Sequence, residues 1–462
     1  MSFKTTGFLA ALFIALLGFL YFYEIRGGEG RKQAETEARK VLRIDDTEVV
    51  RLVVQREDTT VVAVREGDGW RILEPLKTGG DRANIESLLR TGKNLEKVQV
   101  VADEASLISG AVDPADFGLG KPEIAVVFER EGEQRDSLFF GDKSPTGSYV
   151  YLRVSGSPEI LAVGAWRKSN FAKGLYDLRD KRVVLFDRDE VRKFEIARDG
   201  QDIVASKQGG DWRLEKPVAD RGDSLVIRRL LSRLWTAQAK RFVTEEATDL
   251  APYGLDDPWM RISIYEGEGL ALKEVILGDG LRAGRIKRYY GKYVAKSPVF
   301  TVDSTFVKEM MKTPSELRYK KIFAFDSEGI DRVVLVYPDS TVDCRKDTSS
   351  QAWTTLEPRF HAASGKSVED LIERVKELEA VRFAAETLVL PETYGLDAPA
   401  VQVKLWKAGQ LAREVALGRK GEQVYARGDA RPQVVEVGRS ILERLTLELS
   451  PFIPDSVQTQ VP

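Results

Sequence analysis

The chain has 462 residues, a length typical of about three domains. Its 70 basic and 72 acidic residues nearly cancel, so no overall field would steer it to nucleic acid or to a strongly charged partner. With one cysteine, Cys344, and one histidine, His361, it can form no internal disulfide and cannot assemble a zinc site from these residue types. We expect no cofactor.

An uncharged apolar segment, residues 7–23, lies near the start of the sequence. As a helix it would span roughly 25 Å, slightly less than the bilayer core of about 30 Å. Lys4 would lie at one membrane interface, and Tyr21 and Tyr23 at the other. A cleaved signal peptide is the alternative, but no small-residue cleavage site follows. The segment predicts an uncleaved anchor after a cytoplasmic N-terminus, residues 1–6.

The charges around this segment bear on its orientation. A polar, helix-prone stretch, residues 24–44, follows it like a short stalk and carries several basic residues, whereas only Lys4 precedes it. The positive-inside rule therefore favours a cytoplasmic location for the bulk of the chain. Counting charges alone argues against export.

Three sequence markers then recur in one order. They are a tryptophan with a proline five residues later, an aromatic-Gly-Leu turn with its own proline, and a strand that ends in glycine. The tryptophans are 142 and 141 residues apart, and the strand-end glycines 137 and 140. One period in three markers predicts tandem copies of one module, each large enough to bury its own core. The markers are Trp70, Trp212 and Trp353; Phe117-Gly118, Tyr253-Gly254 and Tyr394-Gly395; and Gly141, Gly278 and Gly418.

Each copy shows the same succession of elements. In the first, alternating apolar residues predict strands over 49–56 and 60–65, and helical spacing of apolar residues predicts a helix over 83–89. Strands grouped before and after a helix favour the α+β class with mainly antiparallel sheets. The predicted modules are 45–180, 181–320 and 321–452, followed by a tail, 453–462.

These features together resemble a bacterial family, domain of unknown function 4340, over about residues 1–450. The apolar segment, the Trp…Pro strand, the Tyr-Gly-Leu-Asp-x-Pro turn, the Leu-Gly strand end and the segment Leu178-Arg-Asp-Lys181 carry the resemblance. It implies a single-pass protein of the bacterial inner membrane with its bulk in the periplasm, which outweighs the charge count. It also implies association with an ABC transporter similar to the gliding-motility system. The family has no established catalytic residues to transfer.

Several short motifs suggest chemistry, but each has a simpler structural explanation. Residues 364–367, Ser-Gly-Lys-Ser, resemble the end of a phosphate-binding loop, but Phe360 stands where that motif needs glycine, so they predict a helix start. His361 and Cys344 occur in one module only and lack a nucleophile elbow. The aromatic-Gly-Leu motif could clamp a ligand, but its residues are those that a turn requires. Acid pairs at Asp45-Asp46, Asp187/Asp189 and Asp256-Asp257 lie in predicted turns.

A basic segment distinguishes module two from its copies. Gly278 and Tyr293 are 15 residues apart, whereas the corresponding glycine and tyrosine are 10 apart in module one and 7 in module three. This spacing predicts an elongated hairpin, whose cations and aromatic rings suit phosphate, a lipid headgroup, an anionic glycan or an acidic protein surface. A solvated hairpin is the alternative, and nucleic acid is not expected. Its residues are Arg282, Arg285, Lys287, Arg288, Tyr289, Tyr290 and Lys292.

Two functions of different classes remain open. The first is a non-enzymatic, membrane-anchored scaffold or binding protein that works with protein partners in an envelope complex. The second is an envelope hydrolase for a glycan or peptide, with carboxylates converging in a cleft between modules.

Overall fold

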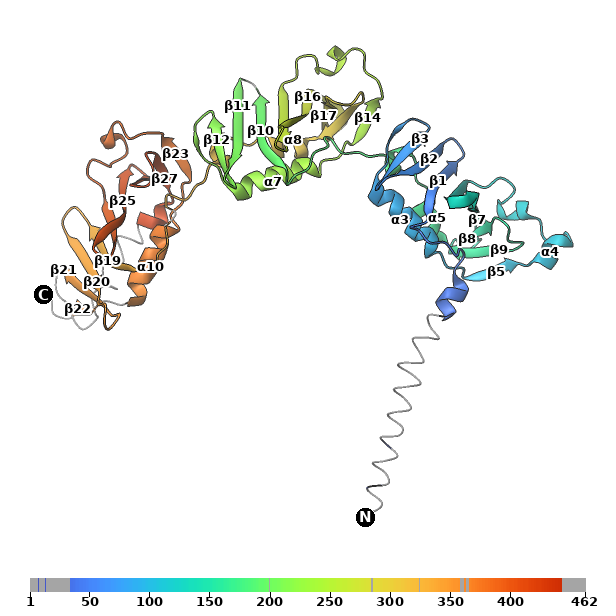
Figure 1. Cartoon of the computed structure of the whole chain (residues 1–462), viewed down its shortest axis with the longest axis horizontal. Helices are drawn as coiled ribbons and strands as arrows, with labels where there is room; N and C mark the ends of the chain where they lie inside the picture. The colour runs from blue at the N-terminus through green and yellow to red at the C-terminus, as the bar shows by residue number, and fades with distance from the viewer. Residues whose placement is uncertain are drawn as a thin grey trace. The chain divides into compact units, whose positions relative to one another are not determined.

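The computed structural model describes residues 34–442, except 199, 284–285, 324, 358–360 and 363–364, together with Gly7 and Phe13 (Figure 1). Apart from those two single residues, the predicted anchor lies outside the described part, as do Lys4, Tyr21, Tyr23 and the tail. Within the described residues, no helix is long and apolar enough to cross a membrane.

Module one contains a nine-stranded antiparallel sheet in the order β4-β3-β2-β1-β6-β7-β8-β9-β5. Its strands are β1 (Val49–Arg56), β2 (Thr60–Glu66), β3 (Gly69–Glu74), β4 (Thr78–Gly79), β5 (Gln99–Ala102), β6 (Ile124–Arg130), β7 (Arg135–Lys143), β8 (Tyr149–Val154) and β9 (Ile160–Gly164). The helices of this module are α3 (Arg82–Lys93), α4 (Glu104–Ile108), η2 (Pro114–Phe117), η3 (Glu131–Glu133), α5 (Ala165–Phe171) and α6 (Leu175–Leu178).

Module two repeats this order as β13-β12-β11-β10-β15-β16-β17-β18-β14. Its strands are β10 (Val191–Arg198), β11 (Gln201–Gln208), β12 (Asp211–Lys216), β13 (Asp220–Arg221), β14 (Arg241–Thr244), β15 (Met260–Glu266), β16 (Ala271–Ala283), β17 (Ile286–Tyr293) and β18 (Val299–Asp303). Its helices are α7 (Ser224–Trp235), η4 (Ala251–Tyr253), α8 (Ser304–Met310) and α9 (Pro314–Leu317).

Module three has the order β22-β21-β20-β19-β24-β25-β26-β27-β23. Its strands are β19 (Ile330–Val336), β20 (Thr341–Lys346), β21 (Trp353–Glu357), β22 (His361–Ala362), β23 (Arg382–Ala385), β24 (Val401–Lys407), β25 (Gln410–Lys420), β26 (Gln423–Gly428) and β27 (Val434–Val437). Its described helices include α10 (Gly365–Lys376) and η5 (Pro391–Thr393). Three sheets of one topology confirm the predicted α+β modules.

The long helix that follows the tryptophan strand covers one face of each sheet. In module one, Ile85, Leu88 and Leu89 of α3 pack into a core with Trp70 and Phe128. Asp81 begins the helix by accepting a hydrogen bond from the backbone N–H of Asn84, as expected for an N-cap. In module three, α10 begins at Gly365, which confirms that the Gly-Lys-Ser segment is a helix start.

The opposite face of the sheet carries a smaller apolar cluster. Phe139 and Tyr151 alternate along their strands with core residues, so they point away from α3. They pack with Phe117 and the buried Leu119 of the aromatic-Gly-Leu turn. This turn therefore closes the face that the helix leaves open.

By internal contacts the chain separates into two compact units. The first contains residues up to 182 together with 238–241, and the second contains 183–237 and the residues from 242 onward. Apart from residues 181–182 and 238–241, modules two and three thus belong to one unit.

Candidate functional site

The aromatic-Gly-Leu turn and the strand-end glycine lie against each other. Gly254 has a φ of 61°, a left-handed conformation that favours glycine. A Cβ atom on Gly278 would overlap the carbonyl oxygen of Tyr253, and one on Gly141 would overlap that of Phe117. Two of the three repeated markers are therefore parts of one contact between main chains.

The aromatic residue of each turn also meets a tyrosine from the strand after that glycine. The ring centroids are 4.7 Å apart for Phe117 and Tyr151 and 5.1 Å apart for Tyr253 and Tyr290, in edge-to-face geometry that stabilises aromatic pairs. Tyr394 and Tyr425 repeat the contact at 5.1 Å. We call this set of turn, glycine and tyrosine the staple; its parts serve packing in every copy.

The basic hairpin of module two is formed by β16 and β17. The predicted equivalence of Tyr293 and Tyr425 is wrong. Leu277 pairs with Gly291 as Leu417 pairs with Ala426, so the residue of module two that corresponds to Tyr425 is Tyr290. Twelve residues, not 15, separate Gly278 from that tyrosine. The segment is still the longest of the three, but Tyr290 belongs to the staple.

The other members of the hairpin have mixed roles. Lys292 donates to the carbonyl oxygens of Lys296 and Ser297, and burial lowers the pKa of its ammonium group. Tyr289 packs against Trp259 at 5.7 Å, and the Lys287 ammonium lies 4.9 Å from its ring. Arg282 and Lys287 are exposed, Arg288 is partly buried, and Arg285 lies outside the described residues. The described cations thus have different surroundings, and binding there stays a prediction.

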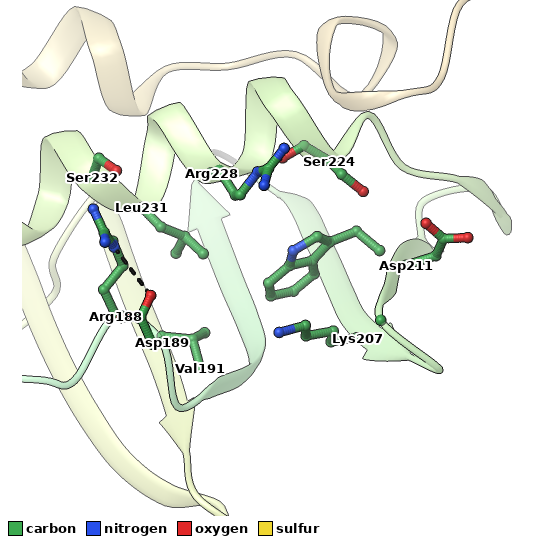
Figure 2. Close-up of a pocket in the computed structure, with 11 residues that line it drawn as sticks. Arg188, Asp189, Val191, Lys207, Asp211, Ser224, Arg228, Leu231 and Ser232 are labelled. Carbon is green, nitrogen blue, oxygen red and sulfur yellow. Dashed lines mark hydrogen bonds and ion pairs between the residues drawn. The ribbon is translucent and has the colours of Figure 1, made fainter.

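A groove of about 660 Å³ lies in module two between the tryptophan strand and α7 (Figure 2). We call it the module-two groove. Its walls come from the loop before β10, from the hairpin of β11 and β12, and from one side of α7. It is lined by Arg188, Asp189, Val191, Lys207, Gly210, Asp211, Trp212, Ser224, Arg228, Leu231 and Ser232.

Trp212 and Leu231 give this groove an apolar wall. Only 4% of Trp212 is exposed, and its ring packs 5.5 Å from that of Phe194 in the core. Leu231 is buried on the inner face of α7. This wall is fixed by the module core, so its shape is set before any ligand arrives.

Three cations surround the wall. Arg188 pairs with its neighbour Asp189 at 3.5 Å, and Arg228 donates to the carbonyl oxygen of Ser224 in its own helix at 3.1 Å. The ammonium group of Lys207 has no ion pair or hydrogen bond within the described part of the chain. The groove therefore presents positively charged side chains that form no strong contact within the module.

The same place in module three has the opposite charge. A groove of about 390 Å³ is lined by Trp353, Lys346 and several acids, and Glu369 and Glu373 of α10 stand where α7 has Arg228 and Ser232. Glu373 accepts from the Ser327 hydroxyl at 2.5 Å, which lowers the pKa of this carboxyl. The acids are Asp326, Glu328, Glu369 and Glu373.

Module one fills the equivalent place with its own side chains. The Arg65 guanidinium lies 4.8 Å from the centre of the Trp70 ring and donates to the carbonyl oxygen of Val49 at 3.1 Å. Lys93 reaches Asp46 at 2.6 Å, and this hydrogen bond raises the pKa of Lys93. One position in the fold is thus covered in module one, basic in module two and acidic in module three.

The remaining sequence candidates have structural roles. Asp45 accepts from the backbone N–H of Thr47, which lowers the pKa of Asp45, and Asp187 accepts from the N–H of Asp189, so these acids do lie in turns. Burial raises the pKa of the Cys344 thiol, which lies 3.7 Å from the Thr355 hydroxyl. Such a thiol is not activated for nucleophilic attack.

No group of three or more metal-ligating side chains occurs among the described residues. The side chain of His361 lies outside them.

Modules two and three meet at an ion-pair cluster that the sequence analysis missed. Arg318, only 4% exposed, donates to Asp220 at 2.6 Å and to both oxygens of Glu386, at 2.7 and 2.9 Å. Arg431 also donates to Asp220, at 2.8 Å, and both guanidiniums lie over the ring of Phe383. Carboxylates do converge at this junction, but arginines bind them. The recurring Leu178-Arg179 and Leu317-Arg318 were the only signal for a buried arginine here.

A family model matches the chain over residues 70–224 and again over 212–399, which together span more than two thirds of the sequence. The chain belongs to the family described as Domain of unknown function (DUF4340). The two matches begin at Trp70 and Trp212, so the family unit starts at the tryptophan strand and runs into the next module. This confirms the resemblance to the family that the repeated markers carried.

The other comparisons add little. No curated protein matches the chain. Among solved structures, a sliding clamp, the β subunit of DNA polymerase III, from Pseudomonas aeruginosa bound to griselimycin is 9% identical over 87% of this chain and 95% of that chain. Its TM-score of 0.14 is too low to carry an argument about fold or function.

Proposed function

We propose that this protein is a membrane-anchored, periplasmic scaffold that binds protein partners, without catalysis, as an accessory of an ABC-transporter-type envelope complex. The observation that carries the proposal is that the surroundings of the three repeated tryptophans differ between the modules. One fold repeats, while the groove at this position changes its charge from copy to copy. Such divergence on a constant frame suits a protein that presents different surfaces to different partners.

The anchor and the module junction support the same role. The apolar segment, residues 7–23, would hold the modules at the membrane. The cluster around Arg318 fastens modules two and three to each other, which reduces the entropy lost when both engage a partner. Weak contacts on several modules then add to one useful affinity.

Copurification tests the binding role. The full chain with a C-terminal tag, extracted from its own membranes in mild detergent, should bring down transporter subunits in fixed proportion. A tagged anchor, residues 1–44, serves as the control. Recovery of no transporter or envelope protein beyond that control would contradict the scaffold role.

Topology is tested separately. A C-terminal alkaline phosphatase fusion should be active, because this enzyme matures only outside the cytoplasm. An expressed but inactive fusion would restore the cytoplasmic location that charge counting favours.

A further inference from the structure

The module-two groove has the properties of a binding site for a short segment of another protein. Its volume of about 660 Å³ lies within the range of ligand sites, roughly 300–1,000 Å³. Figure 2 shows that Lys207 extends from the sheet, Arg228 from α7 and Arg188 from the loop before β10. The three cations therefore surround one opening from three elements.

These cations are available to a ligand. The pair between Arg188 and Asp189 is exposed, with side-chain exposures of 46% and 84%, so it holds Arg188 only weakly. The guanidinium also lies 5.7 Å from the centre of the exposed Trp235 ring, at the outer limit of a cation–π contact. Arg228 contacts only a carbonyl oxygen of its own helix, and Lys207 is unpartnered within the described residues. A bound carboxylate would gain charge-assisted hydrogen bonds and would break no strong internal contact.

The rest of the lining narrows the ligand class. Asp189 and Asp211 also face the groove, so a uniformly anionic polymer or a phosphate-rich surface would place like charges together. Trp212 and Leu231 offer an apolar wall, and Ser224 and Ser232 lie along α7 beside it. A segment with spaced carboxylates, an apolar side chain and free backbone N–H groups complements all of these features.

We infer that the module-two groove binds an acidic peptide segment of a protein partner. Its carboxylates pair with Arg188, Lys207 and Arg228, and an adjoining apolar side chain packs on Trp212 and Leu231. This inference rests on the proposed scaffold role and names the chemistry of one of its partners. The covered position in module one and the acidic groove in module three predict that this ligand binds neither of them.

A labelled peptide provides the test. The probe is a fluorescein-labelled dodecapeptide that repeats Gly-Glu-Leu-Ser three times, added to the purified full chain in neutral detergent and followed by fluorescence anisotropy. We expect saturable binding that weakens with added salt, because exposed charges are screened. The matched peptide with glutamine in place of glutamate should bind about tenfold more weakly or not at all.

Two neighbouring arginines on α7 provide matched variants. Arg228→Glu should weaken binding about tenfold, and Lys207→Gln by a smaller factor. Arg229→Glu makes the same charge change on the same helix, but Arg229 does not line the groove, so the affinity should change less than about twofold. Far-ultraviolet circular dichroism confirms that each variant is folded.

Three outcomes would overturn the inference. They are no binding of the glutamate peptide, equal affinity for the glutamine peptide, and equal losses from Arg228→Glu and Arg229→Glu. Full competition by phosphatidylglycerol vesicles or by inorganic polyphosphate would assign the groove to a membrane or a phosphate polymer instead. Failure here with intact copurification would remove the groove assignment alone, whereas peptide binding without copurification would remove the scaffold role.

Discussion

The staple and the module-two groove lie on the same module but differ in how they recur. The staple repeats in all three copies with the same glycine, turn and aromatic pair. The groove position keeps its tryptophan and the cation paired with it, but the charges on the long helix and on the loop before the first strand change from module two to module three. Repetition within this chain therefore marks what the fold needs, and variation marks where the copies have become specialised.

This difference separates two kinds of residue by the cost of changing them. Staple and junction residues contact main chain or buried charge, so their substitution should reduce stability. The charged groove residues Lys207 and Arg228 form no strong contact within the module, so their substitution should leave stability nearly unchanged. The following predictions test that division, beginning with the largest expected effect.

Asp220→Ala should destabilise the junction of modules two and three by about 3 kcal/mol or more, because it leaves the buried Arg318 and the partly buried Arg431 without their shared carboxylate. Hydrogen exchange measures the effect locally, at the amide of Ala380, which donates to the carbonyl oxygen of Lys320 across the junction. Asp211→Ala removes the same charge from an exposed pair and should cost less than about 0.5 kcal/mol. Equal protection in both variants would show that the cluster does not hold the junction.

Gly278→Ala should destabilise module two by about 1–3 kcal/mol, since the new methyl group overlaps the carbonyl oxygen of Tyr253. The midpoint of urea unfolding of the full chain, followed by tyrosine and tryptophan fluorescence, measures it. Gly269→Ala meets no atom within 4 Å and is the control. An unchanged midpoint for Gly278→Ala would contradict the staple.

Glu316 should make stability depend on pH. Burial acts to raise the pKa of this carboxyl, but hydrogen bonds from the Thr313 N–H and from Lys312 outweigh it and lower the pKa to about 2, below the ordinary 4.5. A lowered pKa stabilises the fold above about pH 4.5, and this contribution disappears as the pH falls towards 2.

Because Glu316 is partly exposed, the contribution should be less than about 1 kcal/mol. Unfolding curves of the wild-type chain and of Glu316→Gln, recorded between about pH 6 and about pH 2, measure this contribution to the unfolding free energy. A carboxyl of this kind titrates within that interval. The variant should lose part of the pH dependence. Identical slopes would show that the carboxylate contributes nothing.

Lys207→Gln should change the unfolding free energy by less than about 0.5 kcal/mol, because Lys207 has no partner that folding provides within the described residues. The same urea titration measures this. A loss comparable to that of Gly278→Ala would remove the distinction between staple and groove.

The sequence predicted the module fold because its markers are local requirements of that fold. A glycine at a close approach, a helix cap and an alternating strand are each readable from a few neighbouring residues. The spacing within a motif also excluded a false site, because Phe360 stands where a phosphate-binding loop needs glycine, and the Gly-Lys-Ser segment begins α10.

The grooves and the junction could not be predicted in the same way. Lys207, Trp212 and Arg228 come together only through the pairing of β11 with β12 and the packing of α7. Asp220 and Arg431 are more than two hundred residues apart in sequence. The cations of the basic hairpin are close together in sequence, so the hairpin could be predicted as a candidate site. The cations of the groove come from three separate elements, so no sequence pattern predicts that they meet.

The connection between modules two and three has a mechanical consequence. Leu317 and Tyr319 form backbone hydrogen bonds back to Asp223 and Arg221, while Lys320 and Ile322 form them forward to Ala380 and Leu378. Each residue of this short connecting segment thus forms a backbone hydrogen bond to one module or the other, or lies next to a residue that does. A pulling force on module three would load these bonds directly, because no slack polypeptide is present to extend first. The joint should yield abruptly, at a threshold force, rather than stretch like a spring.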